Sequence, residues 1–267
     1  MVTGLSKREV EVISHLELDK KKFVRADDIV NILKCSRKEA YKIIHNLKKK
    51  ERIVEIKKGE YFLIPIKGVE GYWTENPLLI ASRLTSPCYI SYRTALNFYG
   101  FTEQIPVTVF IACKRYLKQI NVREMRFKFV QLSGYKFFGC IQAEIDGEKI
   151  NIADKEKTLV DCMDKQQYSG GISEVAKGLW EAKNEINFTK LVDYAVRMKN
   201  QSLLKRLGYL TDILNLDMDL GKVEDKIKSR RFVPLSTAHK PRGKVNHRWK
   251  VIENIPKEEI LSWKEVF

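Results

Sequence analysis

The sequence of 267 residues is first informative for what it lacks. No apolar run approaches the roughly 18 to 20 residues that span a bilayer, and the N-terminus, MVTGLSKREVEV, has no signal-peptide core. The five cysteines are scattered, odd in number and without a C-x-x-C pair, and the four histidines do not fall at metal-ligand spacing. These absences argue against a membrane protein, a disulfide framework and a zinc site, and they predict a cytoplasmic protein with reduced thiols.

Common catalytic and cofactor-binding motifs are also missing. The chain has no G-x-x-x-x-G-K-[ST] phosphate loop, no G-x-G-x-x-G and no G-x-S-x-G. We therefore expect a protein that is not an enzyme, with no catalytic residues, no metal and no cofactor.

Positive charge is what the sequence has in excess. Lysine and arginine number 49 against 34 aspartates and glutamates, which gives a net charge of +15 and a pI near 9.5. Apolar residues make up 44%, enough for a folded core. A polyanion is the first partner to consider, with nucleic acid ahead of an acidic protein or an anionic membrane.

The first 66 residues carry the signals of three helices and a hairpin. Capping boxes at Ser6-Glu9 and Ser36-Glu39 open helices that run to Leu18 and to about Lys49. A second helix fits residues 26–34, and strands at 53–56 and 61–64 flank a Lys57-Lys58-Gly59 turn. This order predicts a winged helix-turn-helix DNA-binding domain over residues 1–66.

Charge and apolar residues separate on the helix from Ser36 to Lys49. Ala40, Ile43, Ile44 and Leu47 share one face, and the opposite face is basic. A helix of this kind fits the major groove, where lysines neutralise phosphates and other side chains reach base edges. Two other interpretations of the basic face stay open: it is an ordinary solvated surface, or the winged helix binds only protein. The DNA-binding candidates are Arg37, Lys38, Tyr41, Lys42, His45, Asn46, Lys49, Lys57 and Lys58.

The rest of the chain is predicted as a linker, a second domain and a tail. Glycines and a proline mark a linker at 67–77, and residues 78–220 alternate between strand and helix periods. We expect an α+β fold, a mixed α/β domain with a small, mainly antiparallel sheet and then a helical segment. A basic C-terminal extension, 221–267, follows. This extension carries a candidate second basic patch, which comprises Arg230, Arg231, Lys240, Arg242 and Lys244. The patch is either a site for phosphate, a nucleotide or RNA, or an exposed charged tail without a ligand.

A Mg²⁺-dependent nuclease with a winged-helix arm is the rival interpretation. Acidic residues and a lysine gather near the predicted Asp146-Gly147 turn, as they do in nucleases that hold Mg²⁺ on adjacent strands. The spacing is poor, because neighbouring Glu148 and Lys149 leave opposite faces of a strand, and Glu156 and Lys157 fall on a predicted helix. Glu144 and Asp154 complete the set.

Four segments resemble a known family in the same order. The run YISYRTALNFYGFTEQIP (89–106) is similar to the S-x-x-S-A-L-x-x-x-G-L-T-E-Q-I-P region of AbiEi antitoxins, which are predicted transcriptional regulators of abortive-infection, or viral-defence, systems. IADKEKTLVD (152–161) resembles their A-x-x-E-K-T-L-x-D segment, and SGG (169–171) and KRLGYL (205–210) resemble two later landmarks. Phe101 and Thr94 depart from the pattern, where leucine and serine are usual.

The resemblance implies a function. Such proteins repress their own operon by binding inverted repeats in its promoter through the N-terminal domain. They also counter a nucleotidyltransferase toxin without a stable complex. The Gly-Ser motif and spaced aspartates of such a toxin are not found here, so the chain resembles the antitoxin.

Within these segments, the residues favour structural roles over direct toxin contact. We expect Gly100 and Gly208 to allow chain reversals after helices, Asp154 to cap a helix, and Lys157 to face solvent. We also expect Arg206 to pair with a carboxylate such as Glu156 or Asp161, and Ser91 to cap the helix that ends near Tyr99.

Overall fold

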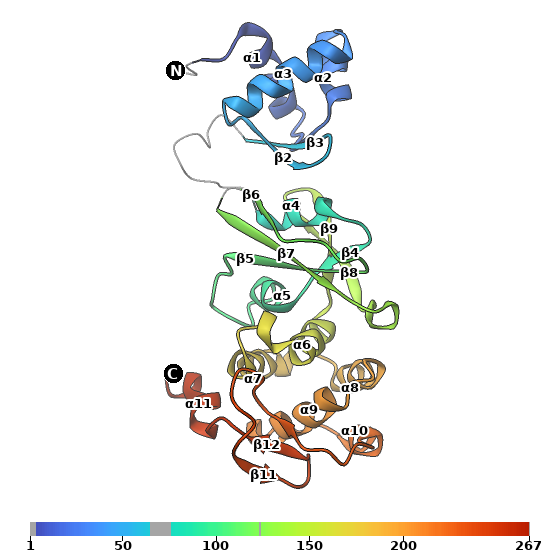
Figure 1. The fold of residues 1–267 in the computed structure, drawn as a ribbon, viewed down its shortest axis with the longest axis vertical. Coiled ribbons are helices and arrows are strands. Elements are labelled where there is room, and N and C mark those ends of the chain that lie inside the picture. The colour runs from blue at the N-terminus through green and yellow to red at the C-terminus, as the bar shows by residue number, and fades with distance from the viewer. Residues whose placement is uncertain (1–3, 65–75, 123, 267) are drawn as a thin grey trace. The chain divides into compact units, whose positions relative to one another are not determined.

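The computed structural model describes residues 4–64, 76–122 and 124–266 (Figure 1). The chain divides into two compact units, Met1–Leu84 and Thr85–Phe267. The predicted linker at 67–77 lies outside the described residues except for Asn76 and Pro77. In the part of the chain that is described, no helix is both long and apolar enough to cross a membrane.

The N-terminal unit interleaves helices with a small sheet. A three-stranded sheet has the order β1-β3-β2, and both of its strand pairs are antiparallel. The expected helices and hairpin are present, and β1 is an addition that the sequence pattern did not indicate. The elements are α1 (Lys7–Leu18), β1 (Phe23–Val24), α2 (Ala26–Leu33), α3 (Arg37–Lys49), β2 (Ile53–Lys57), β3 (Glu60–Leu63) and α4 (Pro77–Leu84).

Both predicted capping boxes are confirmed. The Glu9 amide donates to Ser6 Oγ at 3.3 Å, and Glu9 Oε2 accepts from the Ser6 amide at 2.6 Å. The same reciprocal pair forms between Ser36 and Glu39 at the start of α3. These bonds satisfy amides that a helix N-terminus otherwise leaves without partners, so the first turns of α1 and α3 are fixed locally.

The second unit contains a six-stranded sheet of order β6-β7-β5-β4-β9-β8. The pairs β6–β7, β5–β4 and β9–β8 are antiparallel, whereas β7–β5 and β4–β9 are parallel, so the sheet is mixed. The predicted Asp146-Gly147 turn is confirmed, with φ of 50° and 79° at the two residues. The strands are β4 (Cys88–Ile90), β5 (Thr108–Cys113), β6 (Ile120–Val122), β7 (Met125–Gln131), β8 (Cys140–Ile145) and β9 (Glu148–Ala153).

Helices accompany this sheet and follow it along the chain. Asp154 caps α6 as expected, its side chain accepting the Lys157 amide at 2.7 Å. The fold is therefore mixed α+β, as predicted in outline. The helices are α5 (Tyr92–Phe98), α6 (Lys155–Asp164), α7 (Ile172–Glu181), α8 (Phe188–Arg197), α9 (Gln201–Leu214), α10 (Gly221–Lys226) and α11 (Lys257–Leu261), with 3-10 turns η2 (Gly134–Lys136), η3 (Gln166–Tyr168), η4 (Ala182–Asn184) and η5 (Ser262–Val266).

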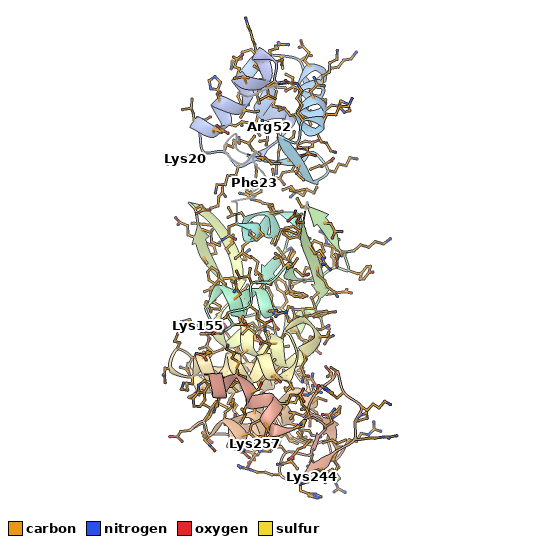
Figure 2. All side chains as sticks on the ribbon, turned by 90° about the vertical axis from the view of Figure 1, so that its left-hand side faces the viewer. Lys20, Phe23, Arg52, Lys155, Lys244 and Lys257 are labelled. Carbon is orange, nitrogen blue, oxygen red and sulfur yellow. The ribbon has the colours of Figure 1, made fainter. Side chains whose placement is uncertain are left out.

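The segment expected as a basic extension folds onto the second unit. Its strands β10 (Val233–Pro234), β11 (Lys244–Asn246) and β12 (Val251–Glu253) form a sheet of order β10-β12-β11 (Figure 2 labels Lys244, on β11). Trp249 is completely buried, and it joins Leu235, Val251 and other residues of this segment in the core that α6, α7 and α9 share.

Gly208 explains how Trp249 fits, and it corrects an expectation. The residue lies in the middle of α9 and makes no chain reversal. A Cβ at this position would sit 2.2 Å from ring carbons of Trp249, far inside van der Waals contact. The indole nitrogen donates to Asp212 Oδ2 at 2.6 Å, which fixes the ring against the glycine.

Candidate nucleic-acid interface

The basic side of α3 is held in place by its apolar underside. Ala40, Ile43, Ile44 and Leu47 are buried, as predicted, in a core with residues of α1, α2 and the small sheet. Every residue predicted to contact DNA, on α3 and on the β2–β3 hairpin, is exposed. We call six of them the α3 face: Lys38, Tyr41, Lys42, His45, Asn46 and Lys49.

An ion pair fixes the C-terminal end of α3. Lys50 Nζ lies 2.7 Å from Glu9 Oε2, and Glu9 is 1% exposed. Burial alone would raise the pKa of Glu9, but hydrogen bonds from Lys50 and Ser6 outweigh it and lower the pKa below the ordinary glutamate value. The carboxylate thus stays charged at neutral pH and ties the start of α1 to the end of α3.

Not all the predicted basic residues are free to bind a ligand. Arg37 pairs with Asp27 at 2.8 Å. Lys57 pairs with Glu60 at 2.8 Å and donates to the Arg83 carbonyl at the same distance. These two cations are partly neutralised inside the unit, so they are weaker candidates for phosphate contacts than exposure alone suggests.

The remaining lysines are different. Among the described residues, no carboxylate lies within ion-pair distance of Lys38, Lys42, Lys49 or Lys58. Lys38 and Lys42 are one helical turn apart on the α3 face, with His45 and Asn46 one turn further on. Lys58 lies at the tip of the β2–β3 hairpin. An exposed helix face with unneutralised cations and adjacent hydrogen-bonding side chains has the chemistry for phosphates and base edges.

The predicted second basic patch is also exposed. Arg230, Arg231, Lys240, Arg242 and Lys244 form no ion pair among the described residues. The neighbouring Arg248 does, with Asp212 at 3.0 Å and Glu224 at 2.8 Å. The patch therefore consists of cations that the fold leaves unneutralised.

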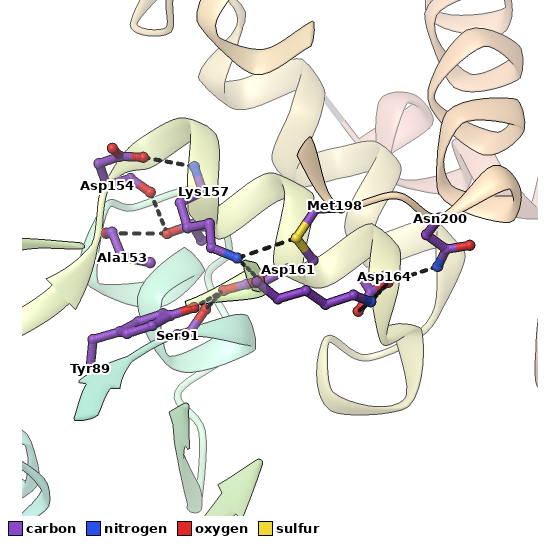
Figure 3. A network of polar contacts seen from close by, with 11 residues as sticks. Tyr89, Ser91, Ala153, Asp154, Lys157, Asp161, Asp164, Met198 and Asn200 are labelled. Carbon is purple, nitrogen blue, oxygen red and sulfur yellow. Dashed lines mark hydrogen bonds and ion pairs between the residues drawn. The ribbon is translucent and has the colours of Figure 1, made fainter. Parts of the chain in front are cut away.

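A buried ion pair in the second unit was missed from the sequence. Lys157 was expected to face solvent, but its side chain and that of Asp161, one turn later on α6, are both 0% exposed and form an ion pair. Tyr89 Oη and Ser91 Oγ donate to Asp161 Oδ2 at 3.0 and 2.8 Å (Figure 3). Ser91 makes no capping bond to α5, and its hydroxyl is directed to Asp161 instead.

This arrangement is what makes the buried charges tolerable. Burial raises the pKa of Asp161, while the Lys157 ammonium and the two hydroxyls oppose that rise. Burial also raises the pKa of Tyr89 well above the ordinary tyrosine value, so its hydroxyl remains a donor. The first two segments with the family resemblance are therefore joined by direct hydrogen bonds between Tyr89, Ser91 and Asp161.

Two of the carboxylates considered for a nuclease, Glu156 and Asp154, have partners in the fold. Glu156 accepts from the Asn187 amide and from Lys190 Nζ, each at 2.8 Å. Asp154 caps α6 and accepts from Tyr194 Oη at 3.1 Å. Within the described ranges, no group of three or more His, Cys, Asp or Glu side chains is placed to hold a metal ion.

Arg206 also differs from its expectation. Its guanidinium donates to the Pro234 carbonyl at 2.9 and 3.2 Å and makes no ion pair with Glu156 or Asp161. The contact attaches α9 to β10. A backbone carbonyl in a later segment is not a partner that sequence spacing can indicate.

Comparison with known proteins identifies a shared fold. No protein-family model matches the chain, and no curated protein matches it either. Three solved chains match, and one of them is the crystal structure of the RV2827C protein from Mycobacterium tuberculosis. The TM-score is 0.68 at 14% sequence identity, over 98% of this chain and 96% of that one. At this identity the similarity concerns the fold alone.

Proposed function

We propose that the protein binds duplex DNA through its N-terminal unit and represses its own promoter. In this proposal α2 and α3 are a helix-turn-helix, the β2–β3 hairpin is its wing, and the unit is a winged helix. The observation that carries it is the α3 face, a row of exposed and unneutralised cations on a helix with a rigid apolar underside.

The division of roles on this face follows from chemistry. Lys38, Lys42 and Lys49 neutralise phosphates, which supplies affinity and salt dependence. His45 and Asn46 reach base edges, Asn46 with the pair of groups that adenine presents in the major groove. Lys58 contacts the backbone from the wing.

Fluorescence anisotropy with the protein's own upstream DNA tests this proposal. Lys42→Glu with His45→Ala is expected to weaken binding at least about tenfold and to reduce the slope of log K against log salt by about 0.9 or more. The matched control is Lys7→Glu with His15→Ala, the same exchanges at exposed positions of α1. Equal affinities for both double variants would rule out α3 as the reading helix.

The same titration separates the alternatives. A Mg²⁺-dependent nuclease would degrade the probe with Mg²⁺ and spare it with EDTA. A winged helix that binds only protein would leave the anisotropy unchanged even at low salt. We expect binding of intact probe under both conditions.

We further propose, on the resemblance to AbiEi antitoxins, that the second unit counters a nucleotidyltransferase toxin encoded by a neighbouring gene. The four segments that carry the resemblance all lie within this unit. Co-expression of the toxin with the Lys42→Glu/His45→Ala full-length variant is the test. Growth should be rescued while promoter repression is lost. Loss of rescue by this folded variant would contradict the division of labour.

A further inference from the structure

One end of the small β10-β12-β11 sheet brings cations together from separate segments. Arg231 lies two residues before β10, and Lys250 directly precedes β12. The Val233 amide donates to the Lys250 carbonyl at 3.0 Å, and the Lys205 ammonium, from α9, donates to the Arg231 carbonyl. We call this end of the sheet the β10 corner, defined by Lys205, Arg230, Arg231, Phe232, His247 and Lys250.

The β10 corner has an excess of positive charge that the fold does not neutralise. Lys205 is completely buried, and its hydrogen bond goes to a carbonyl, not to a carboxylate. Burial lowers the pKa of Lys205, and the positive charge of Lys250 lowers it further. Asp212 and Glu224 form ion pairs with Arg248. A buried cation beside further cations produces a field that favours an anion.

An aromatic pair lies at the same corner. Phe232 is 39% exposed, and its ring meets that of His247 edge to face, with centroids 5.6 Å apart and planes at 90°. A partly exposed ring next to arginines is the combination on which proteins stack unpaired bases while holding the adjacent phosphates.

The other end of the sheet continues the basic surface. Lys244 is paired in register with Glu253, and Asn254 Nδ2 donates to the Lys240 carbonyl at 3.2 Å, so the Lys240–Lys244 loop lies against the end of β12. Val245 is 45% exposed between the two basic ends. A strand of this length spans roughly 10 Å, so a short oligonucleotide reaches both ends.

We propose that this surface of the second unit binds single-stranded nucleic acid, separately from the α3 face. Arg230 and Arg231 hold phosphates, Phe232 stacks on a base, and the Lys240–Lys244 loop contacts the backbone further along. A duplex does not satisfy the same site, because the faces of its bases are covered by their neighbours. RNA and DNA share the chemistry used here, phosphate and base faces, and the experiment compares them.

The test uses the full chain with Lys42→Glu/His45→Ala, so that the α3 face does not contribute. Labelled uridine and thymidine oligonucleotides of about 12 residues and a duplex of the same length are titrated across a salt series. We expect one or both single strands to bind more tightly than the duplex. Adding Arg230→Glu/Arg231→Glu should weaken binding at least about tenfold and reduce the salt slope by about 1.4.

Two further variants make the test independent of charge and of folding. Phe232→Ala should weaken binding about fivefold or more, and Phe232→Trp should retain it, because a larger ring still stacks. Lys118→Glu/Lys149→Glu is the matched charge control. Both lysines are exposed, one just before β6 and one in β9, and their exchange should leave the affinity unchanged from that of the background protein. If the arginine variant does not fold, the two Phe232 variants decide the outcome.

Several results would overturn the proposal. They are no binding of either single strand at low salt, equal or tighter binding of the duplex, or the same affinity in Phe232→Ala and Phe232→Trp. Competition by polyglutamate as effective as that by uridine oligonucleotides would show a general polyanion surface and would overturn it as well. Because the background variant lacks the α3 contacts, promoter binding and this site fail or hold separately.

Discussion

Lys42 of α3 is exposed, whereas Lys157 of α6 is buried, and the carboxylates available to each account for the difference. Lys42 remains exposed without an ion pair, because the Glu39 carboxylate, one turn before it on α3, is bonded to Ser36 and Arg8. Lys157 has Asp161 one turn after it, and the pair is buried. The buried Lys157 ammonium has this carboxylate as its partner, and the hydroxyls of Tyr89 and Ser91 supply further donors to the carboxylate.

In the proposed function, charge on α3 serves binding, whereas the buried charges on α6 serve the architecture of the second unit. Removal of charge from α6 should therefore affect stability, whereas its removal from α3 should affect affinity alone. The strongest way to break this contrast is Lys157→Met, which leaves Asp161 buried without its cation. We expect the free energy of unfolding of the second unit to fall by about 3–5 kcal/mol in urea titrations.

A double variant sharpens the reason for that loss. Lys157→Met/Asp161→Asn keeps acceptors and donors near Tyr89 and Ser91 while removing both charges, so much of the stability should return. If the stability lost in the double variant equals the sum of the losses in Lys157→Met and in Asp161→Asn alone, the two charges do not interact, and the ion pair is not the cause of the loss.

Gly208→Ala is the next largest expected effect. The added methyl would overlap the Trp249 ring, so we expect about 2 kcal/mol of destabilisation by urea denaturation. Gly178→Ala in α7 is the control, because its Cβ would lie 3.0 Å from a flexible Leu96 methyl and helix propensity improves. Equal losses at both positions would argue against close packing of Trp249 on α9.

Glu156→Gln should have a smaller, pH-dependent effect. Burial alone would raise the pKa of Glu156, but hydrogen bonds from Lys190 and the Asn187 amide lower it below its ordinary value of 4.5. With the folded-state pKa depressed, the carboxylate contributes its full stabilisation above pH 4.5 and loses it as the pH falls through the folded pKa. We expect a loss of about 1.5 kcal/mol at neutral pH.

The pH series provides the check for this residue. The stability difference between Glu156→Gln and the parent should shrink as urea denaturation is repeated at increasingly acidic pH. Glu185→Gln is the control, an exposed partner of Lys155 at 2.8 Å, which should change stability by less than about 0.5 kcal/mol at any pH. A difference for Glu156 that stays constant into acid would exclude the depressed pKa.

The smallest expected stability effect completes the contrast. Lys42→Glu/His45→Ala changes only exposed side chains, so the unfolding free energy should change by about 0.5 kcal/mol or less while promoter affinity falls. Thermal denaturation followed by circular dichroism measures it. A large loss of stability would mean that the α3 face packs against something, and it would undo the separation between the two regions.

The N-terminal unit was the most predictable part of the chain. Capping boxes at Ser6 and Ser36 mark where helices begin, and the helical period of Ala40, Ile43, Ile44 and Leu47 assigns the buried side. Those signals are local, so a single sequence contains them. The predicted contact residues are exposed in the structure, and their binding of DNA stays a prediction.

In the second unit the unpredicted features depend on partners far along the chain. Strands β4 and β6 are too short for a clear alternating pattern, and their neighbours in the sheet place them. The hydroxyl of Ser91 meets a carboxylate 70 residues later, so its local capping signal was overridden. The i, i+4 spacing of Lys157 and Asp161 indicates that the two side chains can pair, but it does not indicate that they are buried.

The contact between Trp249 and Gly208 also bears on how the chain is made. During synthesis, α9 leaves the ribosome before the indole that covers its glycine, and at translation speeds of roughly 5–20 residues per second the interval is a few seconds. In that interval the surface of α9 at Gly208 is not covered by Trp249 and is accessible to chaperones and proteases. Products that stop short of Trp249 lack this contact and leave α9 uncovered at Gly208.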